Sequence, residues 1–110
     1  MDVFFQSRDA QAKSLNGWAV ERVRFTLRRW TGRVSRAQVL FSDVDGQRHG
    51  VDKRCQVEIV PNQGPRVVVV AVARNWHAAL MMALARAVQT LQRHVVRRRD
   101  LVRAKLPLNP

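Results

Sequence analysis

The spacing of hydrophobic and polar residues changes along the chain and predicts both helices and strands. Apolar residues recur every three to four positions in two long segments, and they alternate with polar residues or run together in shorter ones. The predicted helices span residues 14–30 and 75–103, and the predicted strands span residues 3–5, 36–42, 54–60 and 67–73. The predicted order of elements is therefore β-α-β-β-β-α.

The predicted strands indicate how the sheet is covered. Segments 36–42 and 54–60 alternate, so one side of each strand is apolar and is expected to face the core. Their predicted inward residues are Ala37, Val39, Phe41, Cys55, Val57 and Ile59. The valine-rich segment 67–73 lacks this alternation, which predicts a central or well covered strand. Asp45-Gly46 predicts a long hairpin loop between the second and third strands.

Each predicted helix has a residue suited to cap its start and an apolar stripe. Ser14 and Asn75 are the candidate N-caps, because their side-chain oxygens can accept hydrogen bonds from the first turn. Thr31-Gly32 is expected to end the first helix. The stripe of the second helix contains Leu80, Leu84, Ala87, Val88, Leu91 and Val95. These stripes predict that both helices pack against the sheet.

The length of the chain, 110 residues, fits one domain. The economical arrangement is a two-layer α+β fold, in which a four-stranded sheet carries both helices on one face. We expect a single domain over residues 1–104 and a tail over residues 105–110, where two prolines cannot continue a helix. No signal peptide or membrane span is expected, since the apolar runs are too short.

The charge balance points to a class of partner. The chain has 20 Lys and Arg residues against 8 Asp and Glu residues, a net charge of +12, and 17 of the basic residues are Arg. Guanidinium groups match phosphate oxygens bidentately, so a nucleic acid is favoured over a membrane surface or an acidic protein. The single cysteine fits a reducing, cytoplasmic location.

Half of the net charge lies near the end of the chain. Residues 86–105 contain seven basic residues and one acidic residue, Asp100. Winding at 100° per residue places Arg86, Arg93 and Arg97 together, away from the apolar stripe. An exposed helix face usually interleaves both signs. The excess of basic over acidic residues in this segment therefore predicts an anionic partner. The alternative is a highly charged helix end that has no binding role.

No residue pattern indicates catalysis, a cofactor or a metal. Cys55 alternates inward with apolar residues and is expected to belong to the core. His49, His77 and His94 share no metal-ligand spacing. Asp45-Gly46 is explained by turn chemistry rather than by a calcium loop. We therefore expect neither an enzyme nor a small-molecule substrate.

The three tryptophans could stack on bases or pack in the core. Trp18 and Trp30 lie close to the apolar stripe of the first helix, which favours core packing for both. Trp76 stands at the start of the second helix and is expected to be more open.

Three features together carry a resemblance to a known family. The first is the β-α-β-β-β-α order with a long basic final helix. The second is the pair of segments 42–46 and 50–58, which resembles an Asp-x-x-Gly turn, a glycine and then Asp-Lys-Arg-Cys opening the next strand. The third is segment 75–80, which resembles Asp-x-Tyr-Ala-Ala-Ile. Over roughly residues 1–100, the chain resembles the ribosome hibernation-promoting factors, or ribosome-associated inhibitor proteins.

This resemblance implies a fold and a function. Family members have a fold similar to a double-stranded-RNA-binding domain, which reads shape and phosphates more than sequence. They bind the small ribosomal subunit near the decoding centre and silence idle ribosomes in stress or stationary phase. A longer form carries a C-terminal dimerisation domain, which we do not expect in this chain. The resemblance therefore implies a short-form factor that is a monomer off the ribosome and contacts small-subunit RNA.

The resemblance and the charge pattern together imply an RNA-binding role for ten basic residues. These are Arg86, Arg93, Arg97, Arg98, Arg99, Lys53, Arg54, Arg22, Arg28 and Arg29.

Several positions of the second helix depart from the family pattern. Gln89 stands where a basic residue is usual, Met81 and Ala85 replace acids, and His77 replaces an aromatic hydroxyl residue. Two alternatives therefore stay open. One is a generic binder of structured RNA, and the other is a protein-interaction module. The second alternative would use the apolar residues Met81, Met82 and Val96.

Overall fold

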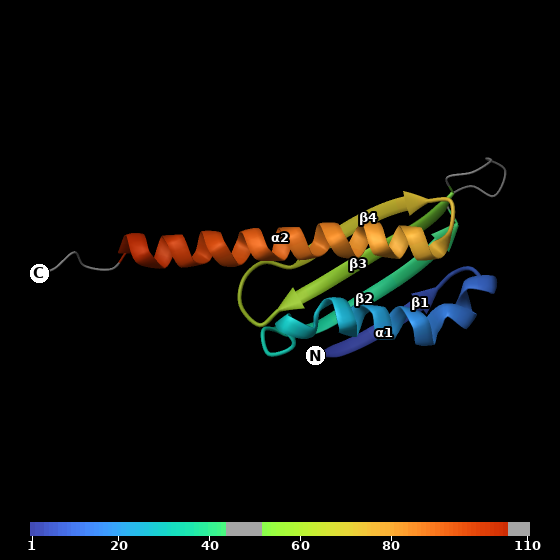
Figure 1. Cartoon of the computed structure of the whole chain (residues 1–110), viewed down its shortest axis with the longest axis horizontal. Coiled ribbons are helices and arrows are strands. Elements are labelled where there is room, and N and C mark those ends of the chain that lie inside the picture. The colour runs from blue at the N-terminus through green and yellow to red at the C-terminus, as the bar shows by residue number, and fades with distance from the viewer. Residues whose placement is uncertain (44–51, 106–110) are drawn as a thin grey trace, which may run out of the picture.

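The computed structural model describes residues 1–43 and 52–105 and confirms the predicted order of elements (Figure 1). The strands are β1 (Asp2–Ser7), β2 (Val34–Asp43), β3 (Lys53–Pro61) and β4 (Val67–Ala73), and the long helices are α1 (Asn16–Thr26) and α2 (Trp76–Lys105). Two short 3₁₀ helices, η1 (Gln11–Leu15) and η2 (Arg28–Trp30), flank α1. The predicted Asp45-Gly46 loop and the predicted tail beyond residue 105 lie outside the described residues.

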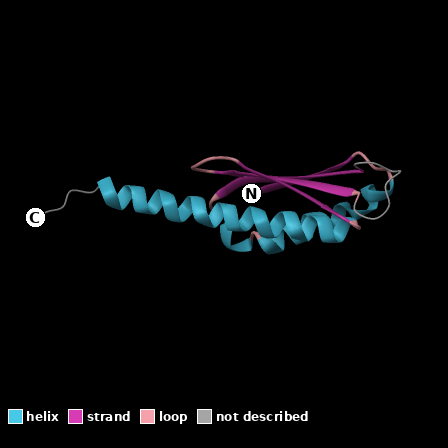
Figure 2. Ribbon diagram, turned by 90° about the horizontal axis from the view of Figure 1, so that it is seen from above, coloured by secondary structure: helices cyan, strands magenta, loops and turns pink. Residues whose placement is uncertain are grey.

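The four strands form one mixed sheet in the order β1-β2-β3-β4. β1 pairs in parallel with β2, while β3 pairs antiparallel with both β2 and β4. The parallel pair is possible because η1, α1 and η2 carry the chain back along the sheet between the two strands. Both helices lie on the same face of the sheet (Figure 2), which confirms the two-layer α+β fold.

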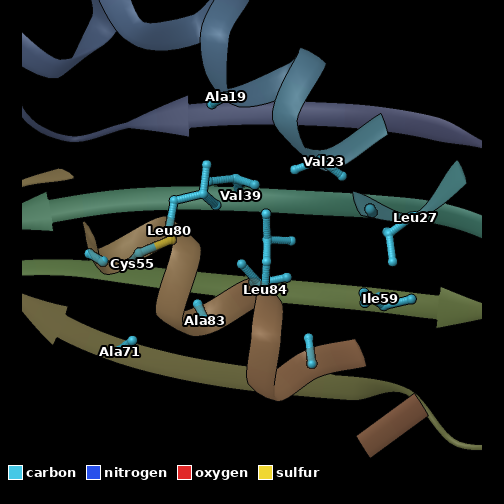
Figure 3. Close-up of a cluster of buried hydrophobic side chains, with 14 of the residues drawn as sticks. Ala19, Val23, Leu27, Val39, Cys55, Ile59, Ala71, Leu80, Ala83 and Leu84 are labelled. Atoms are coloured by element: carbon cyan, nitrogen blue, oxygen red, sulfur yellow. The ribbon is translucent and has the colours of Figure 1, made fainter. Parts of the chain in front are cut away.

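The core lies between the helices and the inner face of the sheet. All six predicted inward residues of β2 and β3 are buried. Figure 3 shows Leu80 and Leu84 of α2 over these strands, with Val23 of α1 beside them. The predicted stripe of α2 is buried at Leu80, Leu84, Ala87 and Leu91 and half-buried at Val88 and Val95. The alternation of the strands and the periodicity of the helix therefore identified the two sides of one core correctly.

The prediction for segment 67–73 was wrong, because β4 is an edge strand. Its inner side packs on α2 and buries Val67 and Ala71. Its outer side leaves Val68 52% exposed and Val70 38% exposed. Valine suits an extended backbone whether or not both faces are covered, so composition alone did not distinguish an edge strand from a central one.

The start of α1 also differs from the prediction. Ser14 is not the N-cap; it lies in η1, where its hydroxyl donates a hydrogen bond to the Gln11 carbonyl at 3.2 Å. Leu15 holds the cap position and makes no side-chain capping bond. The 3₁₀ turn uses the serine locally, so the α-helix begins two residues later than predicted and ends at Thr26.

The start of α2 is capped as predicted. Asn75 Oδ1 accepts a hydrogen bond from the Ala78 backbone N–H at 2.7 Å. The helix has 30 residues and is therefore roughly 45 Å long, about twice the length of the seven-residue β4. Its C-terminal part consequently extends past the end of the sheet (Figure 1). In the described part of the chain, no helix combines the length and hydrophobicity that a bilayer span requires.

Candidate RNA-binding interface

Three arginines lie along one side of α2. Arg86, Arg93 and Arg97 are all exposed. Helical winding places them within about 40° of one another and roughly 120–160° away from Met81, one of the residues through which α2 contacts α1. We call these three residues the α2 flank. It forms a basic strip, roughly 16 Å long, on the side of α2 that faces away from α1.

The α2 flank keeps its charge available for a partner. The ion pairs among the described residues belong to the sheet: Glu58 pairs with Arg36 at 4.0 Å and with Arg66 at 3.3 Å, and Lys53 pairs with two aspartates. None of the flank arginines pairs with an acid whose side chain the structure describes. Arg93 donates only a 3.4 Å hydrogen bond to the Thr90 hydroxyl. The flank can therefore bind phosphates without first breaking an internal ion pair with a described acid.

Arg98 and Arg99 lie next to the flank, but on the other side of the helix. They line a groove between the overhanging part of α2, η2 and the turn over residues 61–65. A Cβ atom added to Gly64, in this turn, would lie 3.9 Å from Arg98 Nη1, so Arg98 reaches the turn closely. Gly64 has a φ of 102°, a conformation that other residues rarely adopt.

The predicted arginines of the first helical segment form a second basic area. Arg22 is half-buried and donates a hydrogen bond through Nε to Met81 Sδ at 3.1 Å. Arg28 is exposed, stacks 4.3 Å from the Phe25 ring centroid and donates to the Phe25 carbonyl at 2.8 Å. Arg29 is exposed without a hydrogen bond among the described residues. This area is on the helical side of the protein, but α2 separates it from the flank.

Lys53 lies far from the C-terminal arginines of α2. Its ammonium is 3.1 Å from Asp43 Oδ2 and 3.5 Å from Asp52 Oδ2, and the hydrogen bond that it donates to Asp43 raises the pKa of Lys53 above its ordinary value. The ammonium also lies 5.4 Å from the Trp76 ring centroid, at the start of α2. Arg97 is roughly 30 Å further along the helix. The positive charge of Lys53 is therefore already balanced locally.

Arg54 points to the opposite face of the sheet. Its neighbour Cys55 is buried inside, so strand alternation turns Arg54 outward, where it donates to Gln56 Oε1 at 3.4 Å. The structure therefore divides the ten predicted residues into separate areas. The α2 flank, the groove, the arginines of the first helical segment and Lys53 share the helical side, with Lys53 apart from the others at the start of α2, whereas Arg54 lies on the opposite face.

Arg33 is a basic residue of this region that the sequence reasoning missed. It lines the same groove as Arg98 and its guanidinium lies 5.9 Å from the Trp30 ring centroid. The signal for Arg33 was weak, because it follows Gly32 in a turn and belongs to no periodic segment. Only the packing of η2 beside α2 brings Arg33 close to the C-terminal arginines.

The tryptophans pack against the core, as predicted for two of them. Trp18 and Trp30 are half-buried against it, and Trp18 stacks on His77 at 4.2 Å between ring centroids. Trp76 is less open than predicted, because it stacks on Phe41 at 4.9 Å. Of the three, Trp30 also lines the groove.

In the part of the chain that the structure describes, neither the free cysteine nor a metal-binding cluster offers a catalytic or metal site. Burial raises the pKa of the Cys55 thiol to about 12, so it stays protonated at neutral pH. Among the described residues, no cluster of histidine, cysteine and acidic side chains could hold a metal ion.

Comparisons with known proteins agree with the geometry of the fold. The sequence matches no protein-family model and no curated protein. The N-terminal domain of Thermus thermophilus Protein Y superposes with a TM-score of 0.67 at 20% identity, over 84% of this chain and 98% of that one. A ribosomal subunit interface protein from Coxiella burnetii superposes with a TM-score of 0.63 at 10% identity, over 87% of this chain and 99% of that one. The chain thus has the fold of these two proteins, and the resemblance inferred from its sequence is confirmed at the level of the fold.

Proposed function

We propose that this protein is a non-catalytic ribosome-associated factor that binds RNA of the small ribosomal subunit near the decoding region and inhibits translation. The observation that carries the proposal is the α2 flank of Arg86, Arg93 and Arg97, which lacks ion pairs with described acids. The flank stands on a fold shared with a protein described as a ribosomal subunit interface protein. A cationic strip on a rigid helix suits a partner that presents phosphates at fixed spacing.

The mechanism needs positioning rather than chemistry. The flank and Arg98 neutralise phosphates of folded RNA, and the arginines of the first helical segment add contacts from the same side. The end of α2 that extends past the sheet reaches into RNA further than the body of the domain could. The bound domain then occupies space that messenger or transfer RNA requires, and translation stops without any bond being made or broken.

Co-sedimentation with ribosomal subunits on a gradient tests this function. The wild type is compared with Arg93→Glu/Arg97→Glu. A matched control, Arg8→Glu/Lys13→Glu, makes the same change of charge at two exposed positions outside the α2 flank. We expect the wild type and the control to travel with the small subunit and the flank variant to stay at the top. If the wild type also stays at the top, the shared fold does not carry a ribosomal function here.

Two further measurements separate the ribosome from other partners. Neutralising about 6–10 phosphates would weaken binding by ~10³ or more between 50 and 200 mM salt, whereas an apolar protein interface would tolerate the salt. Competition with naked RNA hairpins distinguishes a ribosomal factor from a generic binder of structured RNA. Equal affinity for hairpins and for subunits would favour the generic binder.

An in vitro translation assay measures inhibition of translation directly. The Arg93→Glu/Arg97→Glu variant should inhibit translation more weakly than the wild type.

A further inference from the structure

The groove beneath the overhanging end of α2 has features that phosphate binding does not explain. Its walls come from α2, from Trp30 of η2 and from the turn over residues 61–65. Trp30, Leu91 and Val95 contribute apolar surface. A purely electrostatic contact with an RNA backbone needs no such surface, because phosphates bind to exposed cations.

A buried nitrogen in the same groove lacks a partner. His94 lines the groove, and its Nδ1 atom is buried without a hydrogen-bond partner among the described residues. Buried polar atoms in folded proteins are nearly always hydrogen-bonded, so an unsatisfied one calls for an explanation. Because this atom has almost no accessible surface, a ligand in the groove would reach it only after the imidazole ring turns toward the groove, and a hydrogen-bonding edge would then supply the missing partner.

The rim of the groove is cationic. Arg33, Arg98 and Arg99 line it, and none of them pairs with an acid whose side chain the structure describes. The groove therefore combines flat apolar surface, one unsatisfied polar atom and guanidinium groups. An unstacked nucleotide has the complementary parts, namely a base with an apolar face, a polar edge and a phosphate.

We propose that this groove binds one unpaired nucleotide of the RNA, with the base against Trp30 and Val95 and the phosphate at the arginine rim. The proposal rests on the proposed RNA-binding function and adds a contact to a base. RNA is favoured over an acidic protein segment because Arg97 belongs to both the α2 flank and the groove. A strand whose phosphates follow the flank would therefore lead directly into the groove.

Binding of short single-stranded RNA tests the proposal. A labelled oligonucleotide of about seven nucleotides is compared with one of the same length that lacks its bases but keeps its phosphates. We expect the intact RNA to bind roughly 5- to 100-fold more tightly. Equal affinities would overturn the base site and leave phosphate binding intact, while a failure of both RNAs to bind at low salt would overturn the proposed function as well.

Two neighbouring valines provide a matched pair of variants. Val95→Phe fills the groove, and Val96→Phe makes the same change at an exposed neighbour outside its lining. We expect Val95→Phe to lose the preference for bases and to keep the affinity for the RNA without bases, while Val96→Phe keeps both. A preference that survives in Val95→Phe would contradict the proposal.

A second variant, His94→Leu, keeps the proposal testable if Val95→Phe does not fold. His94→Leu removes the unsatisfied nitrogen and should also reduce the preference for bases. Circular dichroism establishes that each variant is folded before binding is compared. A glutamate heptapeptide that competes as strongly as the intact RNA would overturn the proposal, because the groove would then suit an acidic protein segment.

Discussion

Arg22 Nε donates a hydrogen bond to Met81 Sδ across 3.1 Å, and this contact joins α1 to α2 on the surface of the domain. A thioether sulfur is a weak hydrogen-bond acceptor and carries no charge. Met81 is still 39% exposed. The contact therefore positions the Arg22 guanidinium, but the uncharged sulfur does not balance its positive charge.

The first prediction concerns this contact. Met81→Glu should raise the free energy of unfolding by about 0.2–1 kcal/mol at low salt, since a carboxylate beside Arg22 forms a partly exposed ion pair. Urea denaturation followed by circular dichroism measures the change. Met81→Gln is the control, because it offers an oxygen acceptor without charge. If the two variants are equally stable, or if the gain of the glutamate persists at 1 M salt, the ion-pair explanation is wrong.

The second prediction concerns the core. Leu84→Ala should lower the free energy of unfolding by about 2–5 kcal/mol, because the Leu84 side chain is enclosed between α2 and the sheet and the truncation leaves a cavity. Leu101→Ala makes the same change on the same helix, where the side chain is 55% exposed. That control should stay within about 0.5 kcal/mol of the wild type. Similar losses from both variants would mean that the end of α2 is packed against something in solution.

The third prediction concerns the pH dependence of stability through Cys55. An ordinary thiol has a pKa of 9.0, and burial raises that of Cys55 to about 12. Between these values the unfolded chain releases the thiol proton while the folded protein retains it, so folding is favoured below pH 9 and the advantage is lost as the pH rises. The free energy of unfolding should therefore fall by about 1.4 kcal/mol for each pH unit in this range.

Comparison with Cys55→Ala isolates this effect from the titration of other groups. The difference in unfolding free energy between the wild type and the variant is measured from pH 8 to pH 11. We expect the wild-type advantage to shrink above pH 9. A difference that does not vary with pH would show that the folded thiol titrates normally.

The fourth prediction separates paired from unpaired cations. Arg93→Ala should reduce the slope of log affinity against log salt by about 1, because one phosphate contact is lost. Lys53→Ala should leave the slope nearly unchanged, since Asp43 and Asp52 already balance that ammonium. Salt titrations of RNA binding measure both slopes. Equal losses would mean that Lys53 exchanges its aspartates for phosphates when RNA binds.

The features that could be predicted from the sequence are those that depend on local periodicity. The alternation of Cys55, Val57 and Ile59 identified a buried strand face, and Asn75 capped α2 as its side-chain chemistry required. The winding of α2 grouped Arg86, Arg93 and Arg97 on one side, away from its buried stripe. Each of these follows from the geometry of one element, which the order of residues specifies.

Features that depend on the meeting of distant segments were decided only by the tertiary structure. β4 was recognised as a strand, but its place at the edge follows from the sheet order, which its valines do not encode. Lys53 is balanced by Asp43 only because β2 and β3 pair in the register that sets these two residues opposite each other. The groove forms because α2 extends past the end of the sheet and lies beside Trp30, Arg33 and the turn over residues 61–65. The sequence therefore determined the elements and their charge, while the docking of η2 and α2 over one sheet determined which of those charges lie together.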